Sequence, residues 1–194
     1  KNSSGLNRID YFDWYSYTKE LISAEKPDIM VIFMGANDGQ NIRADDGNAY
    51  TMENITNWDN TYRKRVSRFL EENHDSIKYI FWIGHPIPRT ADFHNKFIRM
   101  NPIYESECAK YSNCIYVNSW DRFAINGEFV SQLTDNNGVV GKVKSSDGVH
   151  LTSHGGNILT DLTIDYLNTK INLGEPHPIK LYPQSQPKAI IPMA

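Results

Sequence analysis

Three short apolar runs, separated by amphipathic stretches, constrain the fold of this chain more than any other feature. The runs occupy residues 28–34, 78–84 and 114–118. Near-continuous apolar runs of this length are typical of strands that are buried on both faces of a parallel sheet. Their alternation with helical stretches predicts an α/β fold, in which helices cover both faces of the sheet.

The stretches between these runs have helical spacing. Trp58, Tyr62 and Val66 recur on one side of a helix, for example. Pro102 lies within another such stretch, where we expect a kink or a break. Helices are therefore expected at about residues 11–25, 58–73, 91–111 and 153–173, with a polar excursion at 41–56 and a hairpin insertion at 125–144.

The length and charge of the chain limit its domain organisation and its partners. With 194 residues, we expect one domain over residues 1–173, followed by an extended Pro- and Gln-rich tail at 174–194. The formal net charge of −3 provides no basic field, so nucleic acid is not an expected partner. No apolar run in the sequence has the length of a membrane span, no spacing of His, Cys and acidic residues indicates a metal site, and no cofactor is expected.

Two cysteines, Cys108 and Cys114, leave two alternatives open. Their spacing of six positions suits a small disulfide loop between a helix end and the next strand, which would indicate an oxidising compartment. It equally suits two partly buried free thiols in a reducing compartment.

A carboxylate and an imidazole lie three positions apart in the sequence Asp147-Gly148-Val149-His150. An enzyme that activates a serine needs an imidazole base and a carboxylate that fixes its tautomer, and this spacing lets one loop supply both. By itself the string also fits an Asx turn before the helix that begins near Ser153.

A second polar loop follows the first apolar run in the sequence Gly35-Ala36-Asn37-Asp38-Gly39-Gln40. The amide of Asn37 could donate a hydrogen bond to the oxyanion that forms during acyl transfer, and Asp38 is expected to brace the loop. Gly5, in a polar turn, could present its N–H to the same oxyanion. Each loop alone is also compatible with an ordinary turn.

Taken together, these loops resemble blocks II, III and V of the SGNH (GDSL-like) hydrolase superfamily, whose characteristic residues are Ser, Gly, Asn and His. Gly5 matches the block II glycine, Gly35 with Asn37 and Asp38 matches block III, and Asp147 with His150 matches block V. The extended block III resembles that of a bacterial, envelope-associated subgroup. The resemblance covers residues 1 to about 172 and implies a three-layer α/β/α, flavodoxin-like fold.

The chain departs from the family pattern at its beginning. The family's first block, Gly-Asp-Ser at the end of the first strand, does not occur in this sequence. The resemblance therefore implies that the first strand and most of the second strand of the fold are absent, and that the strand at 28–34 would lose its central neighbour. We expect an N-terminal segment of the same protein to complete the sheet. Ser3, Ser4, Ser145, Ser146 and Ser153 lie near the expected site, but none occupies a strand-to-helix elbow.

The resemblance implies a serine esterase or acyltransferase that acts on small O-acyl esters, such as O-acetyl groups of a cell-envelope glycan, in the periplasm or elsewhere in the envelope. His150 and Asp147 would be catalytic, and Gly5 and Asn37 would form the oxyanion hole. A glycan-binding module or pseudoenzyme with the same cleft is an alternative. A flavodoxin-like nucleotide-binding protein is disfavoured, because no Gly-rich phosphate loop follows a strand.

Overall fold

The computed structural model describes residues 1–172, and its centre is a three-stranded parallel sheet. The strands are β1 (Ile29–Ile32), β4 (Tyr79–Ile83) and β5 (Cys114–Val117), in the order β1-β4-β5. Each strand lies within one of the apolar runs, so all three strand predictions are confirmed. Both pairings in this sheet are parallel, with Phe81 of β4 between Val31 and Ile115.

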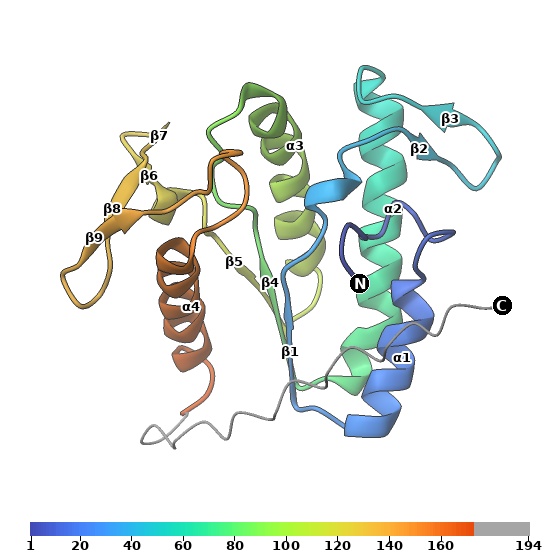
Figure 1. Cartoon of the computed structure of the whole chain (residues 1–194). Coiled ribbons are helices and arrows are strands. Elements are labelled where there is room, and N and C mark those ends of the chain that lie inside the picture. The colour runs from blue at the N-terminus through green and yellow to red at the C-terminus, as the bar shows by residue number, and fades with distance from the viewer. Residues whose placement is uncertain (173–194) are drawn as a thin grey trace, which may run out of the picture.

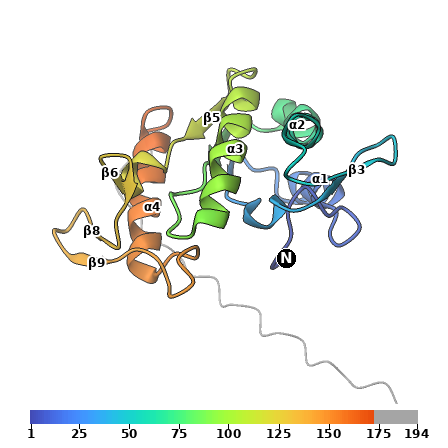
Figure 2. The same ribbon diagram turned by 90° about the horizontal axis from the view of Figure 1, so that it is seen from above.

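Helices cover both faces of the sheet, as the α/β prediction requires (Figures 1 and 2). One face carries α1 (Trp14–Glu25), α2 (Ile55–Asn73) and α3 (Ala91–Cys108), and the other carries α4 (Ser153–Asn168). Successive side chains of β4 alternate between the two layers, because side chains of a strand point to opposite faces in turn.

Two apolar clusters fill the two layers. Ile80 and Trp82 pack with the cluster of α1, α2 and α3, whereas Phe81 and Ile83 pack with the cluster of α4. Three of these four side chains are fully buried. The arrangement is the expected three-layer α/β/α sandwich.

Short hairpins and single turns complete the described part of the chain. The polar excursion forms the hairpin of β2 (Ile42–Arg43) and β3 (Ala49–Tyr50). The expected hairpin insertion consists of two hairpins, which pair β6 (Ala124–Ile125) with β7 (Glu128–Phe129) and β8 (Gln132–Thr134) with β9 (Val140–Lys142). Three 3₁₀ turns are η1 (Ala36–Asp38), η2 (His74–Ser76) and η3 (Asp121–Phe123).

We expected a kink or a break at Pro102, and the break does not occur, because α3 runs from Ala91 to Cys108 with Pro102 inside it. Proline cannot donate to the carbonyl four residues earlier, which belongs to Ile98, an exposed residue. The side chain of Asn101 exchanges hydrogen bonds with the backbone N–H and carbonyl of His85, at 2.8 and 2.9 Å. This anchorage of α3 to the segment after β4 outweighs the local preference for a break.

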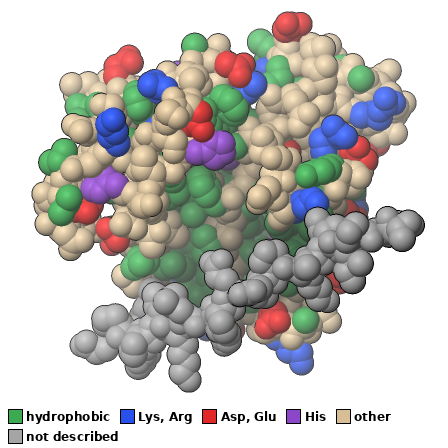
Figure 3. Space-filling view, in the orientation of Figure 1, with side chains coloured by type: hydrophobic (Ala, Val, Ile, Leu, Met, Phe, Trp, Pro, Cys, Tyr) green, Lys and Arg blue, Asp and Glu red, His purple; other side chains and the backbone are tan. Residues whose placement is uncertain are grey.

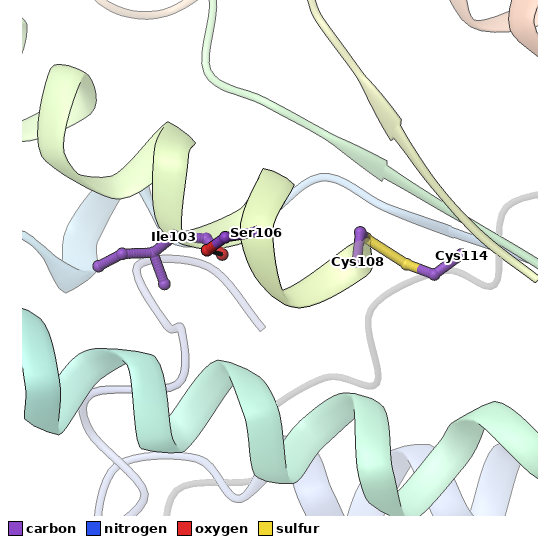
Figure 4. The surroundings of a disulfide bond; sticks show 4 residues. All are labelled: Ile103, Ser106, Cys108 and Cys114. Carbon is purple, nitrogen blue, oxygen red and sulfur yellow. Dashed lines mark hydrogen bonds between the residues drawn. A yellow bond between two sulfur atoms is a disulfide. The ribbon is translucent and has the colours of Figure 1, made fainter. Parts of the chain in front are cut away.

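A disulfide joins Cys108 to Cys114, so the structure selects this alternative over two free thiols (Figure 4). Cys108 is the last residue of α3 and Cys114 is the first of β5, and their Cα atoms are 5.0 Å apart. The bond closes the connection between the helix and the strand.

The end of the chain differs from the sequence-based expectation in one respect. α4 ends at Asn168, five residues before the expected end of the helix at 173. The expected tail at 174–194 lies outside the described residues. Within residues 1–172, none of the helices combines the length and the hydropathy that a membrane span requires.

The outer edge of β1 pairs with no strand in the described structure. Val31 and Phe33 are each 47% exposed along this edge, although both are large apolar residues. Figure 3 shows apolar side chains gathered in the middle of the surface in view, where β1 lies in Figure 1. On the face of the sheet opposite α1, α2 and α3, helix α4 packs over β5. It leaves β1 uncovered on that face.

Candidate active site

The loop before α4 brings a carboxylate and an imidazole together. His150 Nδ1 lies 2.7 Å from Asp147 Oδ2. The other carboxylate oxygen, Asp147 Oδ1, accepts hydrogen bonds from the backbone N–H groups of Val149 and His150, at 2.8 and 3.0 Å. The backbone of the loop therefore holds the carboxylate of Asp147, and the carboxylate in turn orients the ring of His150.

The electrostatics of this pair favour an ionised carboxylate. The hydrogen bond from Val149 N–H, with that of His150, lowers the pKa of Asp147 to about 2. An ionised Asp147 can only accept, so Nδ1 of His150 carries the proton and Nε2 retains its lone pair. Nε2 has no hydrogen-bond partner among the described residues, and the side chain of His150 is 83% exposed.

Arg89 holds this loop from the other side. Its backbone N–H donates to the carbonyl of Gly148 at 2.8 Å, and its side chain donates to the carbonyl of Ser146. Gly148 has a positive φ of 77°, and an added Cβ would lie 2.8 Å from Cβ of Arg89. Reasoning from the sequence missed this role, because Arg89 lies 57 positions from Ser146, whose carbonyl its side chain contacts.

The loop after β1 presents the amide of Asn37. Gly35 begins it with a positive φ of 107°, and the chain then turns through η1. Asn37 is exposed, and its side-chain amide has no hydrogen-bond partner within residues 1–172. Its backbone carbonyl accepts from Gln40 Nε2 at 2.6 Å. The amide N–H groups of Asn37 are thus free to donate to a substrate oxygen.

Asp38 joins the Asn37 loop to the N-terminal turn that contains Gly5. Its buried carboxylate accepts from the backbone N–H groups of Leu6 and Asn7 at 2.8 and 2.9 Å, and from the hydroxyl of Tyr62 at 2.8 Å. Burial raises the pKa of Asp38, and these hydrogen bonds oppose that rise. The backbone N–H of Gly5 makes no hydrogen bond in the described part of the chain.

A buried polar chain continues from Asp38 to the end of β4. The hydroxyls of Tyr62 and Tyr104 are 2.9 Å apart, and that of Tyr104 lies 3.4 Å from His85 Nε2. His85, which follows β4, is buried and stacks on Phe97 with ring centroids 4.2 Å apart. Burial lowers the pKa of His85 to about 3, so its imidazole is neutral.

The loops of Asn37 and of His150 lie at one end of the sheet. The three strands are parallel, so their carboxyl ends share an edge, and both loops lie at this end in Figures 1 and 2. A pocket of about 280 Å³ adjoins the histidine. It is lined by Thr90, Asp92, Phe93, Asp147, Val149 and His150.

No serine of residues 1–172 is hydrogen-bonded to His150. Ser4 is buried, where its hydroxyl donates to the carbonyl of Lys1 at 2.6 Å and accepts from Trp14 Nε1 at 3.0 Å. The assignments of His150 and Asp147 as catalytic residues, of Gly5 and Asn37 as the oxyanion hole, and of Gly35 as a supporting residue stay predictions.

The parallel sheet between helices, with polar loops at its carboxyl edge, defines an α/β protein. The chain belongs to the family described as "Protein of unknown function (DUF459)", whose model matches residues 1–166. No curated protein sequence matches the chain.

Two solved enzymes share the fold. One is a catalytic mutant of Axe2, an acetylxylan esterase from Geobacillus stearothermophilus, with a TM-score of 0.56 and 14% identity over 84% of this chain and 67% of that one. The other is LAE5, an alpha/beta hydrolase enzyme from the metagenome of Lake Arreo, Spain, with a TM-score of 0.52 and 14% identity over 88% of this chain and 71% of that one. This likeness shows a shared α/β fold.

Proposed function

We propose that this protein is a serine esterase or O-acyltransferase whose base is the His150–Asp147 pair. The observation that carries the proposal is the 2.7 Å contact between His150 Nδ1 and an ionised Asp147, which leaves Nε2 open at the carboxyl edge of the sheet. An exposed imidazole held in this way is suited to accept the proton of an attacking hydroxyl.

The reaction begins when a serine hydroxyl attacks the ester carbonyl and gives its proton to Nε2 of His150. The carbonyl oxygen becomes an oxyanion, which accepts hydrogen bonds from Gly5 N–H, the Asn37 amide and the N–H of the serine itself. His150 then donates its proton to the leaving alcohol oxygen as that C–O bond breaks. Water or an acceptor hydroxyl attacks the acyl-serine by the same steps in reverse.

The substrate class that we propose is a small O-acyl ester, such as O-acetyl, on a cell-envelope glycan. The pocket beside His150, at about 280 Å³, suits a small group better than a long acyl chain. Axe2, whose fold the chain shares, is by its description an acetylxylan esterase. The Cys108–Cys114 disulfide supports a periplasmic or other envelope location, because disulfides persist in oxidising compartments.

We further propose that the serine is supplied by an N-terminal segment of the same protein, which pairs with the free edge of β1. A strand parallel to β1 would end beside the Asn37 loop, and a residue after that strand would face the cleft. The apolar groove at this edge supports the proposal. The groove has a volume of about 380 Å³. One wall consists of residues of α1 and Phe69, and the other consists of Pro27 and residues 29–34, which include Val31 and Phe33.

The activity is tested by fluorophosphonate labelling of the protein expressed from its complete gene. We expect labelling of one serine, and His150→Ala should slow it by about a thousandfold or more, since the base is then lost. His94→Ala is the matched control, because His94 packs against the ring of Trp120 and does not line the pocket beside His150. Absence of labelling, or equal labelling of the His150 variant, would favour the glycan-binding alternative.

The source of the serine is tested by complementation. A separate N-terminal segment, added to this chain, should restore labelling, and Val31→Lys in this chain should prevent it. Val140→Lys is the control, because Val140 is also an exposed valine, 62% accessible, but lies on β9. Labelling of the Val31 variant at the native rate would contradict pairing at β1.

A further inference from the structure

Lys144 is a buried lysine directly beneath the His150 loop. Only 8% of the residue is exposed, and its Nζ donates to the carbonyl of Val149 at 2.8 Å. It lies 5.8 Å from the ring centroid of Phe123, and no carboxylate of residues 1–172 forms an ion pair with it. A lysine charge is costly to bury without a partner, so this placement calls for a reason beyond packing.

The bond from Lys144 is directed at one particular peptide group. The peptide between Val149 and His150 has its carbonyl held by Lys144 Nζ at 2.8 Å and its N–H held by Asp147 Oδ1 at 3.0 Å. The backbone of Lys144 also pairs with Leu151 in an antiparallel bridge. Because both polar ends of this peptide are held, its plane is restrained, and with it the backbone from which the His150 side chain projects.

We propose that Lys144 is a positioning residue, which holds the Val149–His150 peptide so that the imidazole of His150 stays against Asp147. Its consequence for catalysis rests on the proposed function, whereas its effect on the ring of His150 does not. Lys144 makes no hydrogen bond to the imidazole of His150. It acts through the backbone carbonyl of Val149.

The charges around Lys144 are consistent with this role. Burial lowers the pKa of Lys144 to about 8, and the nearby charge of Asp147 opposes that decrease. The ammonium group is therefore protonated at neutral pH. His85, another titratable group in its surroundings, is neutral because burial lowers its pKa to about 3, so it adds no repulsion.

The test measures the tautomer of His150 by its ring nitrogen and carbon NMR shifts in the protein expressed from its complete gene. In the unaltered protein we expect the Nδ1–H tautomer to predominate. Lys144→Met removes the donor and keeps the length of the side chain, and should increase the Nε2–H population several-fold. Lys142→Met is the matched control, because Lys142 is an exposed lysine on β9, and it should leave the tautomer unchanged. Lys144→Gln, which keeps an N–H donor, should recover part of the native population.

Each outcome decides the proposal. A folded Lys144→Met protein with the native tautomer population overturns it, and so does an equal shift in the Lys142 variant. Should neither Lys144 variant fold, the proton exchange rates of the two lysine ammonium groups are measured in the unaltered protein. The ammonium of Lys144 donates to the carbonyl of Val149, so its protons should exchange with water more slowly than those of Lys142. Equal exchange rates at the two lysines would overturn the proposal. A tautomer shift in a protein without esterase activity would keep this role for Lys144 and reject the proposed function.

Discussion

Gly5 and Asp38 lie in such close contact that position 5 has no room for a side chain. A Cβ built on Gly5 would lie 2.2 Å from Oδ1 and 2.5 Å from Oδ2 of Asp38. The next two backbone N–H groups, of Leu6 and Asn7, donate to these same oxygens. The absence of a side chain at Gly5 therefore permits the contact that joins the N-terminal turn to the Asn37 loop.

Gly5→Ala should lower the free energy of unfolding by about 1 to 3 kcal/mol, the usual range for overpacking a filled site. The displaced carboxylate would also weaken its bonds to Leu6 and Asn7. Denaturant unfolding of single and double variants measures the effect. In an Asp38→Ala background the same change should be much less destabilising, since the clash has gone. Additive effects of the two substitutions would contradict the contact.

Asp38→Asn should also destabilise the protein, although it is nearly isosteric. Three donors, from Leu6, Asn7 and Tyr62, converge on the two carboxylate oxygens, and an amide offers only one oxygen. At least one buried donor then lacks an acceptor, at a cost of about 1 to 3 kcal/mol. Thermal unfolding provides the measurement, and a variant as stable as the native protein would show that the three bonds are unimportant.

Two adjacent glycines of α4 should respond in opposite directions. A Cβ on Gly155 would lie 2.2 Å from the carbonyl oxygen of Val143, whereas a Cβ on Gly156 would meet nothing within 4 Å. Gly155→Ala should therefore destabilise the protein by about 1 to 3 kcal/mol. Gly156→Ala should stabilise it by about 0.5 to 1 kcal/mol, because alanine favours the helix. Melting temperatures that change in the same direction would refute this packing of α4.

Loss of the disulfide should reduce stability moderately. The bond between Cys108 and Cys114 closes a short loop, with a sequence separation of 6, and the chain-entropy relation gives about 2 kcal/mol for this size. The double variant Cys108→Ser, Cys114→Ser should unfold at a correspondingly lower denaturant concentration. Reductant should lower the stability of the native protein and leave the double variant unchanged. A native protein insensitive to reductant under unfolding conditions would contradict this account.

The lowered pKa of Lys144 predicts that the free energy of unfolding changes with pH in the alkaline range. Its pKa is about 8 in the folded protein and about 10.4 in an unfolded chain. Between these values the unfolded chain holds a proton that the folded chain has released, so the free energy of unfolding should rise with pH. The rise should be on the order of 1 to 3 kcal/mol.

Comparison with Lys144→Met isolates this contribution, because the variant should lack the rise from about pH 8 to about pH 10. Above that range the buried tyrosines oppose it, since burial raises the pKa values of Tyr62 and Tyr104 well above the usual value. In the unfolded chain those hydroxyls ionise at a lower pH than in the folded protein, so the free energy of unfolding should fall again as the pH rises further. Parallel pH profiles for the two proteins would contradict the burial of the Lys144 charge.

Local pattern was sufficient for the elements and for one part of the candidate site. The three apolar runs correspond to β1, β4 and β5, because a strand buried on both faces leaves a continuous apolar run. Asp147 and His150 could be paired from the sequence, because three positions of one loop are enough for their contact. Of the kink or break predicted at Pro102, the break does not occur, and the bonds between Asn101 and His85 that hold this part of α3 span 16 positions.

The sequence by itself determined the α/β layers, the positions of the polar loops and the proximity of Asp147 to His150, since each depends on neighbours in the chain. Only the tertiary structure decided that Asp38 binds the turn of Gly5, that Arg89 and Lys144 hold the His150 loop, and that His85 is buried. A lysine or a histidine in a sequence gives no sign of burial, because burial depends on packing between segments that are distant along the chain. The open edge of β1 is likewise a property of the assembled sheet.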